Sequence, residues 1–96
     1  MDKETVKKEL VEKSNRILDK YSEEYVVESV SVMNMASKTV FLGSLKVYNE
    51  DNMKNIIDDL KNQLNSYGEL SIRDEKVVPC CAANYIHISF NVSISN

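Results

Sequence analysis

The strongest structural signal in this sequence is the alternation of polar and apolar side chains between residues 85 and 95. Successive side chains of a β-strand point to opposite faces of its sheet, so a strand here would have one apolar and one polar face. The apolar face would contain Ile86, Ile88, Phe90, Val92 and Ile94, and the polar face Tyr85, His87, Ser89, Asn91, Ser93 and Ser95. We therefore expect a sheet with one face on a hydrophobic core and the other facing water or a partner.

Two segments have the periodicity of amphipathic helices. From Thr5 to Tyr21, apolar residues recur every three or four positions, with charged residues between them. A second helix is predicted to begin after Asn49, whose side chain can accept a hydrogen bond from a free backbone N–H, and to end before Gly68, which can take the left-handed conformation. The apolar face of this second helix would contain Met53, Ile56, Ile57, Leu60, Leu64 and Tyr67. Burial of each such side chain stabilises the fold by about 1.5 to 3 kcal/mol before entropy is subtracted, so this helix should be a main support of the core.

The segments Tyr25–Met35 and Thr39–Tyr48 are rich in β-branched and aromatic residues, and we interpret them as two strands of a hairpin. In the first strand Val26, Val30 and Val32 would share one face. In the second, Gly43 indicates either a bulge or a close approach of another part of the chain.

A third strand is predicted at Glu69–Arg73, with pairing that resumes at Val77 and Val78 after a charged interruption. Pro79 cannot donate a hydrogen bond to a ladder and should end the pairing. Residues Cys80–Asn84 would then form a loop before the last strand.

The predicted order α-β-β-α-β-β describes a single α+β domain over residues 1–96, with two helices on one face of a four-stranded antiparallel sheet. This order resembles a circular permutation of the ferredoxin-like fold, in which the first strand has moved to the end. In that arrangement the last strand is central, between the strands near residues 40–48 and 69–78. The alternative is an antiparallel meander with the two helices packed differently.

The sheet face away from the helices is the predicted partner-binding surface. If Phe41, Leu45 and Val47 face the helices, the opposite face carries apolar groups among polar ones, which suggests a contact site. The residues assigned to this site are Val40, Leu42, Tyr48, Tyr85, His87, Ser89 and Asn91, with Ser29 and Ser31 beside them.

Composition and charge argue against several classes of function. The net charge is -3, and the cations are offset locally by Glu and Asp, so nucleic-acid binding is disfavoured. The acidic residues are not dense enough for a convincing DNA mimic, although the cluster of Glu50, Asp51, Asp58 and Asp59 leaves that alternative open. No apolar run approaches the roughly 20 residues of a membrane span, and the N-terminal residues lack the apolar stretch of a leader, so we expect no membrane association and a cytoplasmic location.

No residue pattern indicates a cofactor, a metal or a catalytic site. Cys80 and Cys81 are adjacent, and together with His87 they supply at most three of the four ligands of a structural zinc site. We interpret them as two thiols in a loop or partly in the core, without a redox role. His87 could act as a general base, but nothing in the spacing selects a partner for it. The only two glycines, Gly43 and Gly68, are isolated, which excludes a glycine-rich phosphate loop.

These observations favour a small non-enzymatic protein that binds another protein by occupying its surface. By association only, a small, acidic, Asn-rich chain without motifs matches the profile of inhibitors that phages or mobile elements direct against host proteins. Homodimerisation through the open sheet face or an edge strand is compatible with this hypothesis. The alternatives are a small-molecule-binding or catalytic domain with a pocket near His87 and the Cys80–Asn84 loop, and a scaffold subunit of a larger assembly.

Overall fold

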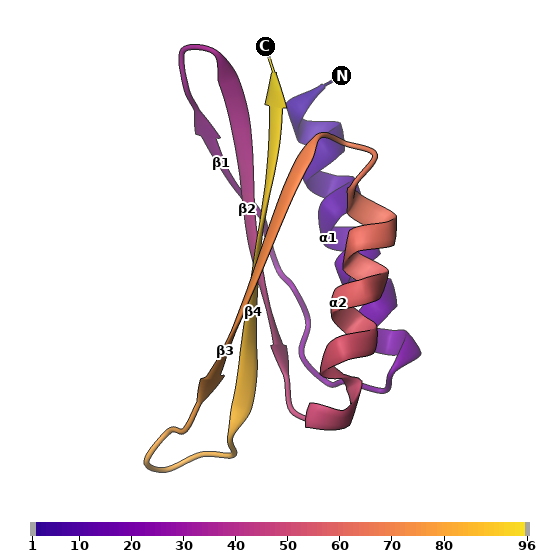
Figure 1. Cartoon of the computed structure of the whole chain (residues 1–96), viewed down its shortest axis with the longest axis vertical. Coiled ribbons are helices and arrows are strands. Elements are labelled where there is room, and N and C mark those ends of the chain that lie inside the picture. The colour runs from indigo at the N-terminus through magenta and orange to yellow at the C-terminus, as the bar shows by residue number, and fades with distance from the viewer. Residues whose placement is uncertain (1, 96) are drawn as a thin grey trace.

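The computed structural model describes residues 2–95, which form an α+β fold with a helical layer and a sheet layer (Figure 1). The elements in chain order are α1 (Lys3–Lys20), β1 (Ser31–Asn34), β2 (Lys38–Val47), α2 (Glu50–Leu64), β3 (Glu69–Val77) and β4 (Tyr85–Ser95). Both helices cover the same face of the sheet, and no element of the described chain covers the other face. The predicted order α-β-β-α-β-β and the predicted layers are therefore confirmed.

The four strands are antiparallel and lie in the order β1-β2-β4-β3. The strand β4 pairs with β2 along residues 38–47 and with β3 along residues 69–77. This is the strand order of the expected permutation, and it excludes a simple meander, in which β2 and β3 would be neighbours. The alternation between residues 85 and 95 thus belongs to a central strand, as predicted.

The core lies between the sheet and the helices. It contains the apolar face of β4, of which Ile86, Ile88, Phe90 and Val92 are almost completely buried and Ile94 is partly buried. From β2 it receives Phe41, Leu45 and Val47, as predicted. The helices contribute Val6, Leu10, Ile17 and Leu18 from α1 and Ile56, Leu60 and Leu64 from α2.

Gly43 is a point of close approach and not a bulge. The ladder between β2 and β4 is continuous, and Gly43 lies directly opposite Phe90. A Cβ atom built on Gly43 would lie 2.2 Å from Cζ of the Phe90 ring. The missing side chain of Gly43 therefore provides the space that the ring occupies in the core.

The predicted strand at Tyr25–Met35 is correct only for Ser31–Asn34. Before Ser31 the chain leaves the sheet because the side chain of Asn15 in α1 binds the backbone of Val27. Its Nδ2 donates to the Val27 carbonyl at 3.0 Å, and its Oδ1 accepts from the Val27 N–H at 2.7 Å. Val27 is consequently buried and Val26 is 62% exposed, so Val26 does not share a face with the buried Val30, contrary to the prediction.

The start of α2 was predicted correctly, but its end was not. Asn49 Oδ1 accepts from the Asp51 N–H at 3.0 Å, as expected of an N-cap. The helix ends at Leu64, before Tyr67, and Gly68 does not have a positive φ. A Cβ atom on Gly68 would lie 2.3 Å from the Ser93 carbonyl oxygen, so this glycine allows the chain to pass close to β4.

The strand β3 is continuous from Glu69 to Val77, so the predicted interruption at Asp74–Lys76 is wrong. Backbone hydrogen bonds to β4 do not depend on side-chain polarity, and the charged side chains of an edge strand can remain in water. Asp74 pairs with Ile88 and Lys76 pairs with Ile86. The side chains of Asp74 and Lys76 are both exposed. Lys76 Nζ also lies 3.0 Å from Glu50 Oε1 at the start of α2.

Polar contacts between the helices involve Asp59 of α2. Its Oδ2 accepts hydrogen bonds from Tyr21 Oη at 2.8 Å and from Lys20 Nζ at 3.1 Å. The hydrogen bond from Tyr21, followed by that from Lys20, holds the pKa of Asp59 below its usual value. Both donors favour the ionised carboxylate, so this contact stabilises the fold at neutral pH and is lost as the pH falls through the lowered pKa.

Substitution Gly43→Ala should destabilise the protein by about 1 to 3 kcal/mol, because its Cβ would overlap the Phe90 ring. Urea denaturation of the variant would measure the loss. The double variant Gly43→Ala with Phe90→Leu should lose less than the sum of the two single variants, because the smaller side chain leaves space for the new methyl group. Additive losses would show that Phe90 is not the group that requires glycine. Ser44→Ala, on the opposite face, is the matched control.

Candidate binding face

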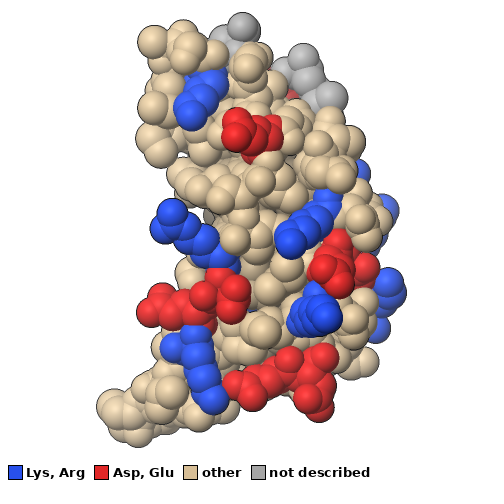
Figure 2. All heavy atoms as spheres, in the orientation of Figure 1, with Lys and Arg blue, Asp and Glu red and all other residues tan. Residues whose placement is uncertain are grey.

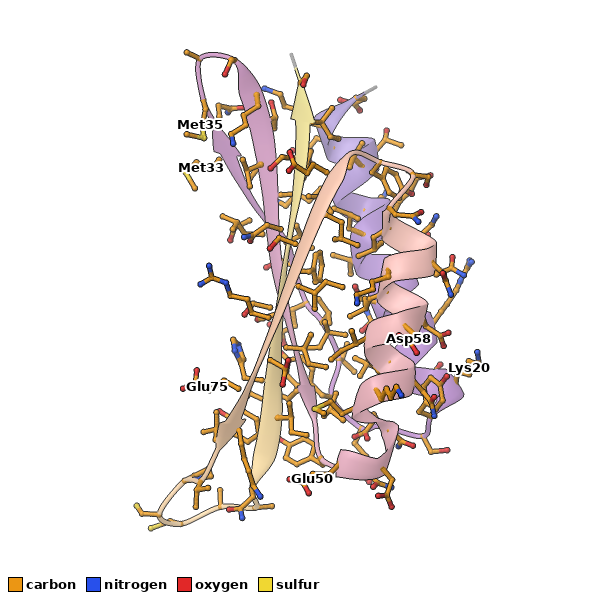
Figure 3. The ribbon with its side chains drawn as sticks, viewed as in Figure 1. Lys20, Met33, Met35, Glu50, Asp58 and Glu75 are labelled. Atoms are coloured by element: carbon orange, nitrogen blue, oxygen red, sulfur yellow. The ribbon has the colours of Figure 1, made fainter. Side chains whose placement is uncertain are left out.

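The sheet face opposite the helices is the candidate functional site, and we call it the open face. It carries the outward residues of three paired strands: Lys38, Val40, Leu42, Ser44 and Lys46 of β2, Tyr85, His87, Ser89, Asn91, Ser93 and Ser95 of β4, and Glu69, Ser71, Arg73, Glu75 and Val77 of β3. Figure 3 shows Glu75, Met33 and Met35 on this side of the ribbon, away from the helices. The face is therefore uncovered along the length of the sheet.

The middle of the open face is polar and contains charges of both signs. Strand register places His87 between Lys46 of β2 and Glu75 of β3. In the neighbouring row, two residues further along β4, Ser89 lies between Ser44 and Arg73. Lys46, Glu75 and Arg73 therefore flank His87 and Ser89, and a partner in contact with this region would need matching charges of both signs.

One end of the open face is apolar and rich in methionine. Met33 and Met35 are 46% and 47% exposed at the turn between β1 and β2. Leu42 is half-buried beside them, while Val40 is only 8% exposed although it lies on this face. Figure 2 shows fewer charged side chains near this end than over the helices and the lower part of β3. Methionine side chains are flexible and adapt to apolar partner surfaces of irregular shape.

The other end of the open face contains a cluster of aromatic rings around Lys46. The rings of Tyr48 and Tyr85 have centroids 5.8 Å apart and are tilted by 54°. Lys46 Nζ lies 5.0 Å from the centroid of Tyr85 and 5.6 Å from that of Tyr25. This geometry is that of two cation–π contacts, which orient the rings while leaving much of Tyr48 exposed.

A cleft of about 600 Å³ opens between these two ends. It lies where the chain before Ser31 leaves the sheet, so that residues 43–47 of β2 have a ladder partner on the β4 side only, within the described chain. Its lining combines Tyr25 and Leu42 with hydrogen-bonding side chains of Glu28, Ser29, Ser31, Ser44, Ser89 and Asn91. The contact between Asn15 and Val27 therefore shapes the cleft by holding this segment away from β2.

Glu23 holds the turn that carries Tyr48 at the aromatic end of the open face. It follows a turn in which Ser22 has a φ of 57° and the Glu23 N–H donates to the Leu18 carbonyl at 2.9 Å, closing the end of α1. The buried carboxylate of Glu23 accepts from the Tyr48 N–H at 3.0 Å and from the Asn49 N–H at 3.2 Å. It also accepts from Asn52 Nδ2 at 3.2 Å. Glu23 therefore joins the end of α1 to the turn that presents Tyr48.

The structure brings most of the predicted site residues together. Leu42, Tyr85, His87, Ser89 and Asn91 are half-buried on the open face, and Tyr48 contacts Tyr85 at one end of it. Val40 contributes little accessible surface. Sequence reasoning missed Tyr25, Met33, Lys46 and Arg73. The parity of residues along each strand would have placed Lys46 and Arg73 on this face, whereas Tyr25 reaches it through an irregular segment that parity does not describe.

The residues considered for other chemistry are separated. Cys80 and Cys81 are both exposed in the β3–β4 loop, and His87 lies between Lys46 and Glu75 on the sheet. A hollow of about 490 Å³ next to this loop is lined by Asn84 and Tyr85 with Tyr48, Asn49, Glu50, Asp51, Lys76 and Ile86. Within residues 2–95, no three side chains of His, Cys, Asp and Glu are grouped as metal ligands.

Comparison with protein-family models, with curated proteins and with solved structures finds no match for this chain. The described helices also do not combine the length and apolarity that crossing a membrane requires.

Substitution Glu23→Gln should destabilise the protein by about 1 to 3 kcal/mol, because an amide N–H would replace one of the oxygens that accept from backbone N–H groups. The free energy of unfolding and the NMR shifts of the Tyr48 and Asn49 amides would measure the effect. Glu24→Gln is the matched control, since Glu24 is exposed next to it in the chain. Equal stabilities of the two variants would contradict this role of Glu23.

Proposed function

We propose that the chain is a non-enzymatic protein-binding module and that the open face is its contact surface. The observation that carries this proposal is the composition of a face that no other described element covers. Exposed or half-buried tyrosine, methionine and arginine side chains gather there, including three of the five tyrosines of the chain. These residue types are enriched at protein interfaces and contribute most strongly to binding.

The distribution of polarity supports a protein partner over a nucleic acid. Lys46 and Arg73 are accompanied by Glu75 and Glu69 on the same face, so the face offers no continuous basic track for phosphates. A methionine-rich end, an aromatic end around Lys46 and a mixed polar centre instead suit a partner surface with its own apolar contacts and charges of both signs. The central cleft can hold a side chain or loop that projects from the partner.

In its more specific form, the proposal is that binding blocks the partner's surface. The chain would act in the cytoplasm as an inhibitor of a host protein, of the kind encoded by phages or mobile elements. A second copy of the chain is the other protein that this face can accept, since the same surface would supply the methionine-rich end, the aromatic end and both signs of charge to a homodimer.

The test is site-specific photocrosslinking in cells that naturally make the protein. A benzophenone side chain at Leu42 or Asn91 should give a discrete crosslinked product, identified by mass spectrometry as a partner protein or a second copy. The matched controls carry the same group at Lys54 or Gln63, which are exposed on α2. Combination with Arg73→Glu and Tyr48→Ala should reduce the product at least about tenfold if the face itself binds. Equal labelling from α2, or no product from the open face, would overturn the proposal.

A second candidate function is the binding of a small polar molecule, which the central cleft favours. Its serine hydroxyls and the Asn91 amide surround a volume within the range of ligand pockets, about 300 to 1,000 Å³. Thermal-shift screening of nucleotides and metabolites would test it. A ligand that raises the melting temperature of the wild type, but not of a variant with Ser89→Leu, would support this function over a protein contact.

A further inference from the structure

A second surface, distinct from the open face, presents two thiols side by side. Cys80 and Cys81 lie in the β3–β4 loop, which projects beyond the ends of both helices in Figure 1. Both are exposed, and their Sγ atoms are 3.3 Å apart. Between residues 78 and 84 the described structure has no backbone hydrogen bond outside the β3–β4 ladder. The pair is thus accessible and is not enclosed by the rest of the fold.

The spacing of the two sulfur atoms suits a single bridging atom better than a direct bond. A disulfide requires about 2.05 Å between the sulfurs and would close a strained eight-membered ring through the intervening peptide. A bridging atom could bond both sulfurs at about 2.3 Å, the length of a typical metal–thiolate bond. At the observed sulfur separation, the bond angle at that atom between the two sulfurs would be about 90°. Bond angles near this value are those of trivalent arsenic and related pyramidal centres.

The surroundings of the pair restrict what the bridging atom can be. Zinc and most other cations need three or four protein ligands, and no such group of side chains occurs in the described part of the chain. The residues from Val78 to Asn84 are also uncharged. A neutral centre that needs only two thiolates from the protein fits this loop better than a cation.

We propose that Cys80 and Cys81 form a bidentate site for trivalent arsenicals and similar soft, thiophilic metalloid compounds. With an organic arsenoxide, each thiol sulfur forms one bond to arsenic and the arsenic–oxygen double bond is broken. The two thiol protons leave with that oxygen as one molecule of water, so nothing is oxidised or reduced and no charge is created. The product is a nine-membered ring that contains arsenic, both sulfurs and the peptide between the cysteines.

The experiment uses the full chain, fully reduced, and phenylarsine oxide as the probe. Intact-mass spectrometry should show one arsenic per chain with the loss of one water. The adduct should survive excess glutathione, a monothiol, and should be removed by dithiothreitol, a dithiol. The variants Cys80→Ser and Cys81→Ser should each bind at least about tenfold more weakly in this competition, because a single thiolate loses the advantage of two linked ligands.

The controls separate chelation from simple thiol reactivity. Alkylation by iodoacetamide should label both cysteines of the wild type and the remaining cysteine of each variant, which confirms accessibility. Because both positions are exposed, the variants should retain the circular dichroism of the wild type. Failure of the reduced wild type to form an adduct that resists glutathione, or an equally resistant adduct in either variant, would overturn the proposal. Neither result bears on binding by the open face.

Discussion

The two backbone ladders of β4 hold the structure together. In the described sheet neither β1 nor β2 pairs with β3. The strand β4 pairs with both β2 and β3 and so joins the β1–β2 hairpin to β3. The alternating apolar side chains of β4 also form the middle of the surface on which both helices pack. The pairing of β2 with β4 also requires that Gly43 have no side chain. The Phe90 ring of β4 can then lie across β2 without separating the two strands.

The division of β4 into two faces also determines where function can lie. Its inward residues from Ile86 to Val92 are packed in the core, whereas its outward residues from Tyr85 to Asn91 are only half-buried on the open face. The segment before Ser31 extends this division, because the Asn15 amide directs Val27 into the core and leaves a cleft beside β2. The hydrogen bonds of Asn15 in α1 therefore shape the surface on the opposite side of the sheet.

Sequence patterns predicted the parts of the fold that depend on regular periodicity. The alternation from residue 85 to residue 95 identified a half-buried strand, the order of the elements placed it in the centre of the sheet, and the cap at Asn49 located the start of α2. The errors occurred where a single long-range contact decides the local structure. Nothing near Val27 in the sequence indicates that Asn15 binds its backbone, and nothing near Gly68 indicates the proximity of the Ser93 carbonyl. For the same reason the outward strand residues of the site were predictable, but Tyr25 was not.

The position of β4 in the chain has a consequence for how the protein is made. Its partners are synthesised first, yet β2 and β3 share no hydrogen bonds and cannot form the sheet on their own. Contacts between residues as distant as Lys38 and Ser95 form only after both ends of that interval have left the ribosome. A nascent chain that lacks residues 85–95 would expose the apolar sides of both helices, the edge of β2 that pairs with β4, and β3 without a partner strand. The full sheet can therefore form only after β4 has emerged from the ribosome, later than the hairpin of β1 and β2.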